Sequence, residues 1–95
     1  AIEADPKYSI AYGNVALINM LENNFQRCYD NVTRAIDLDA DNAHAHYSAA
    51  QCLFMLSKPK AEYMPYYRRY IELEPDNFRT KELYQKYPEL KGAAN

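Results

Sequence analysis

Tyr70-Ile71-Glu72-Leu73-Glu74-Pro75-Asp76-Asn77 is the stretch of sequence that decides the fold, because related stretches precede it at regular distances. It matches Ala35-Ile36-Asp37-Leu38-Asp39-Ala40-Asp41-Asn42, which lies 35 residues earlier, and Ala1-Ile2-Glu3-Ala4-Asp5-Pro6 matches the start of that segment 34 residues earlier still. A period of this length is typical of stacked helical repeats, in which no unit buries its apolar face alone. Stacked repeats present extended surfaces, so the pattern favours binding over catalysis.

The composition favours one small all-α domain. The 95 residues include only two glycines, Gly13 and Gly92, and ten tyrosines but no tryptophan. So few turn residues favour long helices over a sheet with many turns. The net charge of −2 provides no broad basic surface, and we therefore predict no nucleic-acid partner.

The cysteines and the hydropathy pattern say little about where the protein acts. Cys28 and Cys52 each lie in an apolar helical stretch, so we interpret them as small packed residues and not as a disulfide framework. No signal peptide, lipidation motif or apolar run of about 18 residues is present, and we predict no membrane insertion. The chain begins inside a repeat without a methionine, so we interpret it as a fragment of a longer array and leave its compartment open.

Apolar spacings of three and four residues predict five helices, over residues 9–22, 24–38, 43–56, 60–74 and 77–87. Residues 1–4 are expected to end an earlier helix, which Pro6 stops. Pro65 would cost about 3 kcal/mol inside the fourth helix, so regular helix either starts near Met64 or bends there, and we favour the late start. Pro88 ends the fifth helix, and residues 88–95 are predicted to be a disordered tail.

The same spacings predict the packing stripe of each of the first four helices. The stripes are Tyr12, Val15, Ala16, Asn19 and Met20; Phe25, Cys28, Tyr29, Val32, Ala35 and Ile36; Ala45, Ala49, Ala50, Leu53 and Phe54; and Tyr63, Tyr67, Tyr70 and Ile71. The small residues of the third helix would let a neighbouring helix approach closely.

The repeat period and the pattern of packed residues resemble those of the tetratricopeptide repeat (TPR) family, whose unit is a helical hairpin of about 34 residues. The matching residues are Tyr12, Val15, Ala16, Asn19, Cys28, Val32, Ala35 and Ala40 in one unit, and His46, Ala49, Ala50, Leu53, Tyr63, Tyr67, Tyr70 and Pro75 in the next. The resemblance covers residues 1–87, with 1–6 as the tail of a preceding repeat, 7–40 as repeat one, 41–75 as repeat two and 76–87 as a capping helix.

The register of the second unit has two solutions. The first places one inserted residue in the hairpin turn, and the second starts the unit with Tyr47 and places the insertion before its first helix. In the first register, Tyr63 and Tyr70 occupy positions where the family has small alanines. Side chains of this size are expected to push the helices apart or to close the stack.

The resemblance implies an all-α, right-handed superhelix of antiparallel hairpins, with a concave groove lined by the first helix of each unit. In this family such a groove commonly holds an extended peptide or a helix of a partner protein. Carried over position by position, the resemblance implies a groove with Ile10 and Gly13 and with the predicted partner-binding residues Asn14, Leu17, Leu21, His44, Tyr47, Ser48, Gln51, Arg79, Glu82 and Lys86.

Two narrower binding chemistries find little support. A clamp for the carboxylate tail of chaperones, known in the family, would match only Asn14, with Arg79 as the one guanidinium that could grip a carboxylate. His44 and His46 are two residues apart on a helix and do not share a face, so we predict no metal site and no cofactor.

Nucleic-acid stacking and catalysis are also disfavoured. Tyr63, Tyr67 and Tyr70 share one helical stripe and are predicted to pack in the core, although Arg68 and Arg69 lie beside them. No glycine-rich phosphate loop, nucleophile elbow or paired carboxylate signature is present, and we predict that the protein is not an enzyme.

Three hypotheses remain. The leading one is a protein–protein interaction module, a scaffold or chaperone-like adaptor that holds a partner peptide or helix in its groove. The alternative is a structural or self-assembly segment of a longer array, in which an apolar N-terminal edge docks another copy. A secretion-type chaperone built on TPR repeats cannot be separated from the first by sequence.

Overall fold

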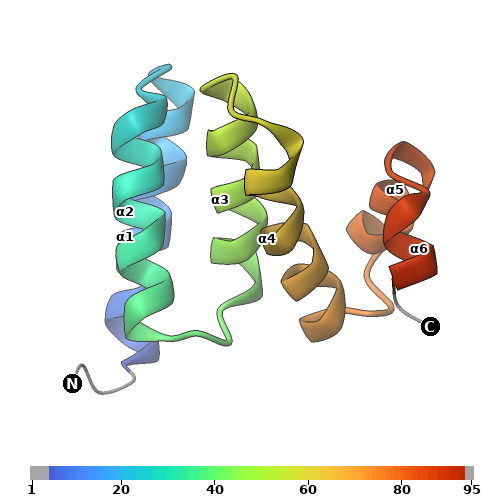
Figure 1. Ribbon diagram of the computed structural model, residues 1–95. Coiled ribbons are helices and arrows are strands. Elements are labelled where there is room, and N and C mark those ends of the chain that lie inside the picture. The colour runs from blue at the N-terminus through green and yellow to red at the C-terminus, as the bar shows by residue number, and fades with distance from the viewer. Residues whose placement is uncertain (1–4, 94–95) are drawn as a thin grey trace.

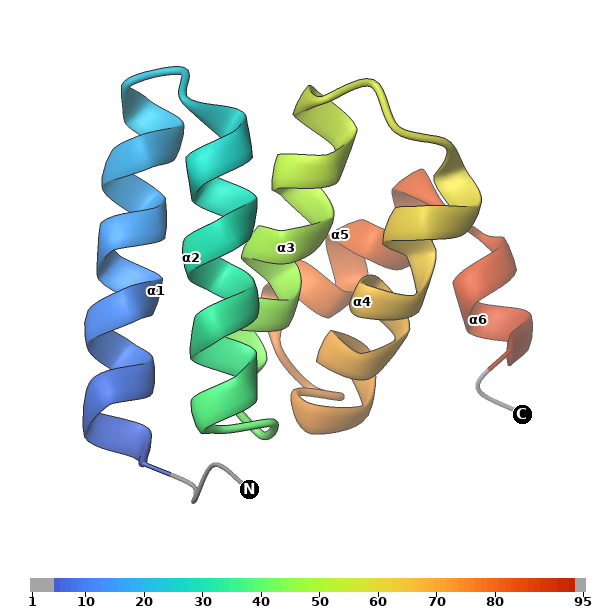
Figure 2. The same ribbon diagram turned by 60° about the vertical axis from the view of Figure 1, so that its left-hand side comes forward.

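The computed structural model describes residues 5–93, which form six helices and no strand (Figure 1). The helices are α1 (Pro6–Leu21), α2 (Phe25–Leu38), α3 (Ala43–Met55), α4 (Lys60–Leu73), α5 (Phe78–Lys86) and α6 (Glu89–Ala93). Successive helices pair as α1–α2, α3–α4 and α5–α6, and the pairs follow one another along the molecule (Figures 1 and 2). The predicted all-α class is confirmed, and the five predicted helices are all present.

Short polar side chains start most of the helices. The carboxylate of Asp5 accepts a hydrogen bond from the Tyr8 amide at 3.4 Å, and the amide oxygens of Asn24, Asn42 and Asn77 accept equivalent bonds at the starts of α2, α3 and α5. Such capping satisfies backbone N–H groups that have no partner inside the helix. Because Asp5 caps α1 and Pro6 occupies its first turn, this helix begins three residues before the predicted start at Ser9.

The repeat in the sequence is also a repeat of backbone conformation. Asn23 and Ser57 are 34 residues apart and adopt positive φ angles of 61° and 60°. The next amide after each turn donates back across the hairpin, from Asn24 to the Asn19 carbonyl at 2.8 Å and from Lys58 to the Leu53 carbonyl at 3.0 Å. The α1–α2 and α3–α4 hairpins are therefore closed by the same left-handed turn.

The core consists of two clusters of different character. Between α1, α2 and α3 it is built from small side chains: Ala16, Cys28, Val32, Ala35, Ala45, Ala49 and Cys52. Around α4 it is built from large ones, with Tyr63, Tyr67, Tyr70, Tyr87, Met64 and Leu83 among its members. Tyr63 and Tyr70, expected to push helices apart, lie in this second cluster with 7% and 0% of their surface exposed.

Two residues of the predicted packing stripes are exposed. Val15 has 44% of its surface exposed, because it points away from α2 and α3 and no other described helix covers that side of α1. Phe54 is 48% exposed, although its ring lies edge-on to Tyr63 with centroids 5.9 Å apart. The remaining members of the stripes are buried or half-buried.

The late start predicted for the fourth helix is wrong. α4 begins at Lys60 and contains Pro65. Proline removes the hydrogen bond to the carbonyl four residues earlier, which belongs to Ala61. Both Pro65 and Ala61 are exposed, so the missing hydrogen bond lies on the solvent side of the helix, and the helix continues through the proline.

The predicted disordered tail is also wrong for residues 89–93, which form α6. Leu90 is 2% exposed and belongs to the aromatic core cluster, and the Lys60 ammonium lies 2.8 Å from the Glu89 carboxylate. Burial of Leu90 stabilises this helix, and the short, polar sequence of the segment does not predict that contact. Residues 94–95 of the predicted tail and residues 1–4 of the predicted stub lie outside the described part of the chain.

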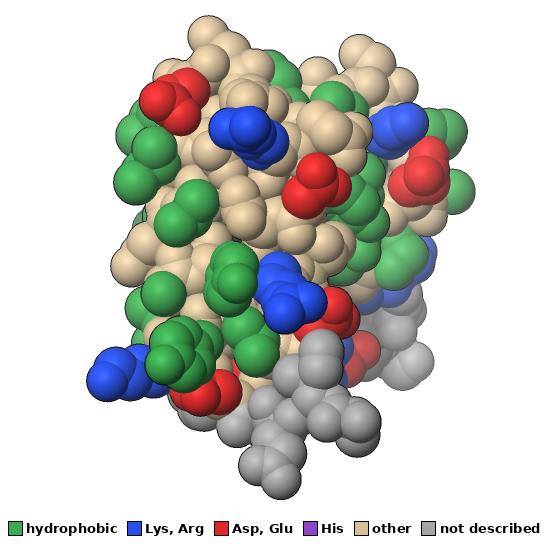
Figure 3. Space-filling model, turned by 90° about the vertical axis from the view of Figure 1, so that its left-hand side faces the viewer, with side chains coloured by type: hydrophobic (Ala, Val, Ile, Leu, Met, Phe, Trp, Pro, Cys, Tyr) green, Lys and Arg blue, Asp and Glu red, His purple; other side chains and the backbone are tan. Residues whose placement is uncertain are grey.

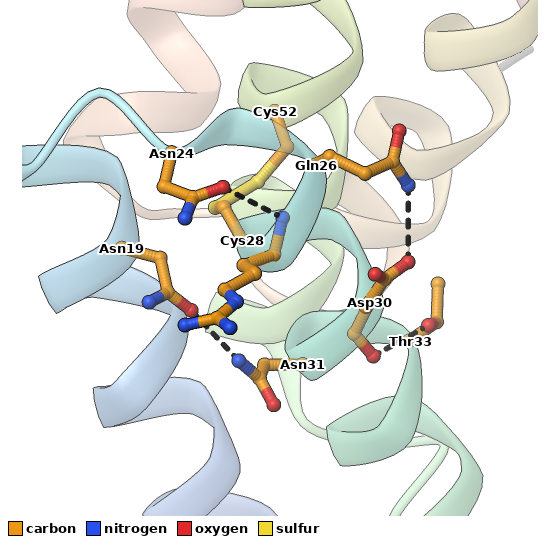
Figure 4. Close-up of a disulfide and its surroundings, with 9 residues drawn as sticks. Asn19, Asn24, Gln26, Cys28, Asp30, Asn31, Thr33 and Cys52 are labelled. Atoms are coloured by element: carbon orange, nitrogen blue, oxygen red, sulfur yellow. Dashed lines mark hydrogen bonds between the residues drawn. A yellow bond between two sulfur atoms is a disulfide. The ribbon is translucent and has the colours of Figure 1, made fainter.

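Cys28 and Cys52 form a disulfide between α2 and α3, which corrects our interpretation of them as separate packed thiols (Figure 4). Both are fully buried and their Cα atoms lie 6.1 Å apart. They are 24 residues apart in sequence, and only the packing of α2 against α3 brings them together. Beside the bridge, the Asn31 amide donates to the Asn19 side-chain oxygen at 2.7 Å and ties α2 to α1 (Figure 4).

Across residues 5–93, no helix combines the length and the apolar character needed to span a bilayer.

Candidate functional site

A groove of about 410 Å³ lies between α1, α3 and the start of α5. These three helices form the far layer of the molecule in Figure 1, behind α2, α4 and α6. The groove is lined by Ile10, Gly13, Asn14, Leu17, Asn42, His44, Ala45, Tyr47, Ser48, Gln51 and Arg79.

Most of the predicted partner-binding residues come together in this groove. Seven of the ten line it: Asn14, Leu17, His44, Tyr47, Ser48, Gln51 and Arg79. Leu21 does not, because it is the last residue of α1 and is 83% exposed beyond the end of the groove. Glu82 is exposed on α5 outside the groove, and the Lys86 ammonium lies 5.3 Å from the centre of the Phe54 ring instead.

The repeat explains why α1 and α3 contribute matching positions. Ile10, Gly13, Asn14 and Leu17 line the groove from α1, and the residues 34 positions later line it from α3: His44, Tyr47, Ser48 and Gln51. Spacings of three and four residues place each set on one face of its helix. Two helices of one repeat type therefore contribute the same face to one surface.

The α3 side of the groove is held in place by the aromatic core. Tyr47 is half-buried, and its ring centroid lies 5.1 Å from that of Tyr70 and 5.7 Å from that of Tyr67. Ser48 also lines the groove and is only 7% exposed, so it places a polar group at the base of the groove. A wall packed in this way changes little when a ligand arrives, which lowers the entropy lost on binding.

Arg79 places a positive charge at one end of the groove. Its guanidinium carbon lies 5.1 Å from the centre of the Tyr47 ring and 5.8 Å from that of Phe78, and Nη1 is 3.4 Å from His44 Nδ1. Within residues 5–93 it has no ion-pair partner. Stacking between two rings orients the guanidinium while leaving its charge available to a ligand.

The α1 side of the groove is apolar and open. Ile10 and Leu17 are 59% and 49% exposed, which is unusual for large aliphatic side chains on one helix face. A methyl group at Gly13 would meet no atom within 4 Å, so the groove is open beside Gly13. The groove thus runs from an apolar flank on α1, across polar groups on its floor, to a cation on α5.

Asn42 and Ala45 line the groove but were not among the predicted residues. Asn42 has structural tasks that explain its position, because its side chain caps α3 and donates to the Ser9 hydroxyl at 2.9 Å. Its place at the helix start was visible in the sequence, but its contact with α1 depends on the stacking of the two hairpins.

The tyrosines near the groove act as neutral packing groups. Burial is the main cause that raises the pKa of Tyr66 and of Tyr87, each to about 12, and it raises those of Tyr67 and Tyr70 as well. The Tyr66 hydroxyl is 3.1 Å from that of Tyr29, joining α4 to α2. These hydroxyls stay protonated at neutral pH, so the cluster supplies no base.

The remaining candidate groups are also used structurally. His46 is 8% exposed, and its Nε2 donates to the Ala40 carbonyl at 2.8 Å. Arg69 forms ion pairs with Glu72 and with Asp41, both at 3.0 Å. Among the described residues, no group of three or more His, Cys, Asp or Glu side chains could hold a metal ion.

Neither the protein-family models nor the curated proteins contain a match to this chain.

Proposed function

We propose that the chain is a TPR-type protein-interaction module, and that its groove binds an extended peptide or a helical segment of a partner protein. One observation carries this proposal. Seven residues expected to face a ligand surround a single groove of about 410 Å³, which is within the usual size range of ligand sites.

The family assignment within this proposal rests on the repeat. The hairpins α1–α2 and α3–α4 have the length of a TPR unit, and their turn residues with positive φ are 34 positions apart. The first helix of each hairpin lines the groove, as the resemblance implies. A right-handed superhelix would follow if further hairpins were stacked in the same way.

The proposed mechanism is recognition by a preformed surface. Apolar side chains of the ligand would pack against Ile10 and Leu17, while Asn14 and Gln51 would form hydrogen bonds with its backbone or polar groups. Arg79 would pair with an acidic group of the ligand and so set its direction. Nothing in this mechanism requires a bond to be made or broken.

A peptide-display selection against the 95-residue protein tests the proposal, with Leu17→Glu as the diagnostic variant. Leu17 is 49% exposed, so a charge there should leave the fold intact but place an anion on the apolar flank. Selected peptides are expected to bind Leu17→Glu at least about tenfold more weakly, because a buried apolar contact is worth about 1–3 kcal/mol.

Met55→Glu is the matched control, because Met55 is 48% exposed and lies outside the groove lining. It should bind the selected peptides as the unchanged protein does. Tyr47→Glu is less informative, since Tyr47 also packs on Tyr67 and Tyr70 and its loss would disturb the core. If the selection yields no peptide, or if Leu17→Glu and Met55→Glu bind the selected peptides equally well, the groove is not the binding site.

A further inference from the structure

A second apolar surface of α1 lies apart from the groove. Lys7, Ala11, Val15, Ile18 and Glu22 follow one another at spacings of three and four, and we call them the outer stripe. All five are exposed, with Val15 at 44% and Ile18 at 54%. Seen from the α1–α2 side of the molecule, hydrophobic side chains form a band along one edge of the face, with charged groups near its ends (Figure 3).

The repeat shows that this is a face on which helices pack. The residues 34 positions after Ala11, Val15 and Ile18 are Ala45, Ala49 and Cys52. They are at most 2% exposed, because α3 uses this face to pack against α2. On α1 the equivalent face has no covering helix within residues 5–93, and it carries larger apolar side chains.

The charges at the two ends of the outer stripe are arranged for an antiparallel neighbour. Lys7 lies in the first turn of α1 and Glu22 is its C-terminal cap, the reverse of what the helix dipole favours. Neither has an ion-pair partner in the described part of the chain. A helix running the other way, with Glu near the start of α1 and Lys near its end, would neutralise both charges and both dipole ends.

The chain itself has this arrangement of charges, because the outer stripe is complementary to the outer stripe of a second, antiparallel copy. When one copy is turned about a point midway between Asn14 and Val15, its Lys7 meets Glu22 of the other copy and its Ala11 meets Ile18, while the two Val15 residues lie next to each other at the axis. An acid then faces a base at each end, and a small side chain faces a large one between them. Self-complementarity of this kind is the condition for a two-fold interface.

The opposite end of the molecule does not fit the outer stripe. Its exposed side chains on α5 and α6 are mainly polar or charged: Lys81, Glu82, Gln85, Lys86, Glu89 and Lys91, with Phe78 as the one large apolar group. Head-to-tail stacking of copies would therefore bury charges against Val15 and Ile18, which is unfavourable.

We propose that the outer stripe of α1 is a self-association site, where two copies pair with their α1 helices antiparallel and form a closed two-fold dimer. A single helix face gives a small interface, so the dimer is expected to be weak, with a dissociation constant in the micromolar to millimolar range. The groove lies on another face of α1 and stays open, so this proposal does not depend on the groove binding a ligand.

Charge reversal tested by sedimentation equilibrium over micromolar to millimolar protein separates this arrangement from others. Lys7→Glu alone and Glu22→Lys alone each place like charges opposite one another twice per dimer, and each should weaken association by about tenfold or more. The double variant restores opposite charges and should recover the dimer. Mixing the two single variants should give a mixed dimer more readily than either variant associates alone.

Three further variants sharpen the test. Ile18→Glu should abolish the dimer, whereas Leu17→Glu, which alters the groove, should not change it. Phe78→Glu should also leave it unchanged, since a head-to-tail stack would need Phe78 and the two-fold dimer does not. Circular dichroism checks that each variant keeps its helices. A monomer at millimolar concentration, species larger than a dimer, or failure of the double reversal to restore association would each overturn the proposal.

Discussion

The hairpins α1–α2 and α3–α4 have the same turn but opposite kinds of core. The first packs through small side chains such as Ala16, Val32 and Ala35. The second packs through Tyr63, Tyr67 and Tyr70. The difference shows that the repeat period sets the backbone path, while side-chain volume sets how each hairpin fills the space between its helices. Substitutions in the two cores should therefore lower the stability of the protein in different ways.

The largest expected effect comes from removing a large side chain from the second hairpin. Tyr70→Ala should lower the free energy of unfolding by about 3–5 kcal/mol, because Tyr70 is fully buried and its ring would leave a cavity. Urea unfolding followed by circular dichroism measures the loss. A loss below about 1 kcal/mol would mean that the aromatic cluster is not the core of this hairpin.

Reduction of the Cys28–Cys52 bridge tests the junction between the two hairpins. The bridge closes a loop between residues 24 positions apart. Reduction should lower the free energy of unfolding by about 3 kcal/mol, because the unfolded chain gains conformational entropy when the loop is opened. Urea unfolding with and without reductant gives the value. The double variant Cys28→Ala with Cys52→Ala should not respond to reductant, and an equal response in both proteins would show that the effect has another source.

A smaller effect is expected from adding volume to the first cluster. Ala49→Leu should cost about 1–3 kcal/mol, because Ala49 is fully buried where α3 lies against α2 and the larger side chain has no space. Ala61→Leu, on the exposed side of α4, serves as the control and should be near neutral. Equal stability of the two variants would contradict the tight packing described between α2 and α3.

The sequence was sufficient for the features that local patterns determine. The spacing of apolar residues placed all five longer helices, because single helices obey that periodicity. The aromatic stripe of α4 was predictable for the same reason. The resemblance to the TPR family, carried over position by position, put Asn14 and Leu17 on the same surface as Ser48 and Gln51.

Features that depend on contacts between distant segments were missed. The disulfide needs α2 to lie on α3, and no spacing rule connects Cys28 with Cys52. α6 forms because Leu90 is buried against the aromatic cluster, which its own short sequence does not reveal. Val15 was assigned to the core because its spacing suits packing, but spacing does not show whether a neighbouring helix is present to cover it.

Amide chemical-shift mapping with a peptide selected on this protein tests the central claim most directly, namely that the matching faces of α1 and α3 form one binding surface. The largest shifts are expected in Ile10–Leu17 of α1 and His44–Gln51 of α3, with smaller ones near Arg79 at the start of α5. Shifts concentrated on the outer faces of α2 and α4 instead, with the groove residues unchanged, would contradict the account.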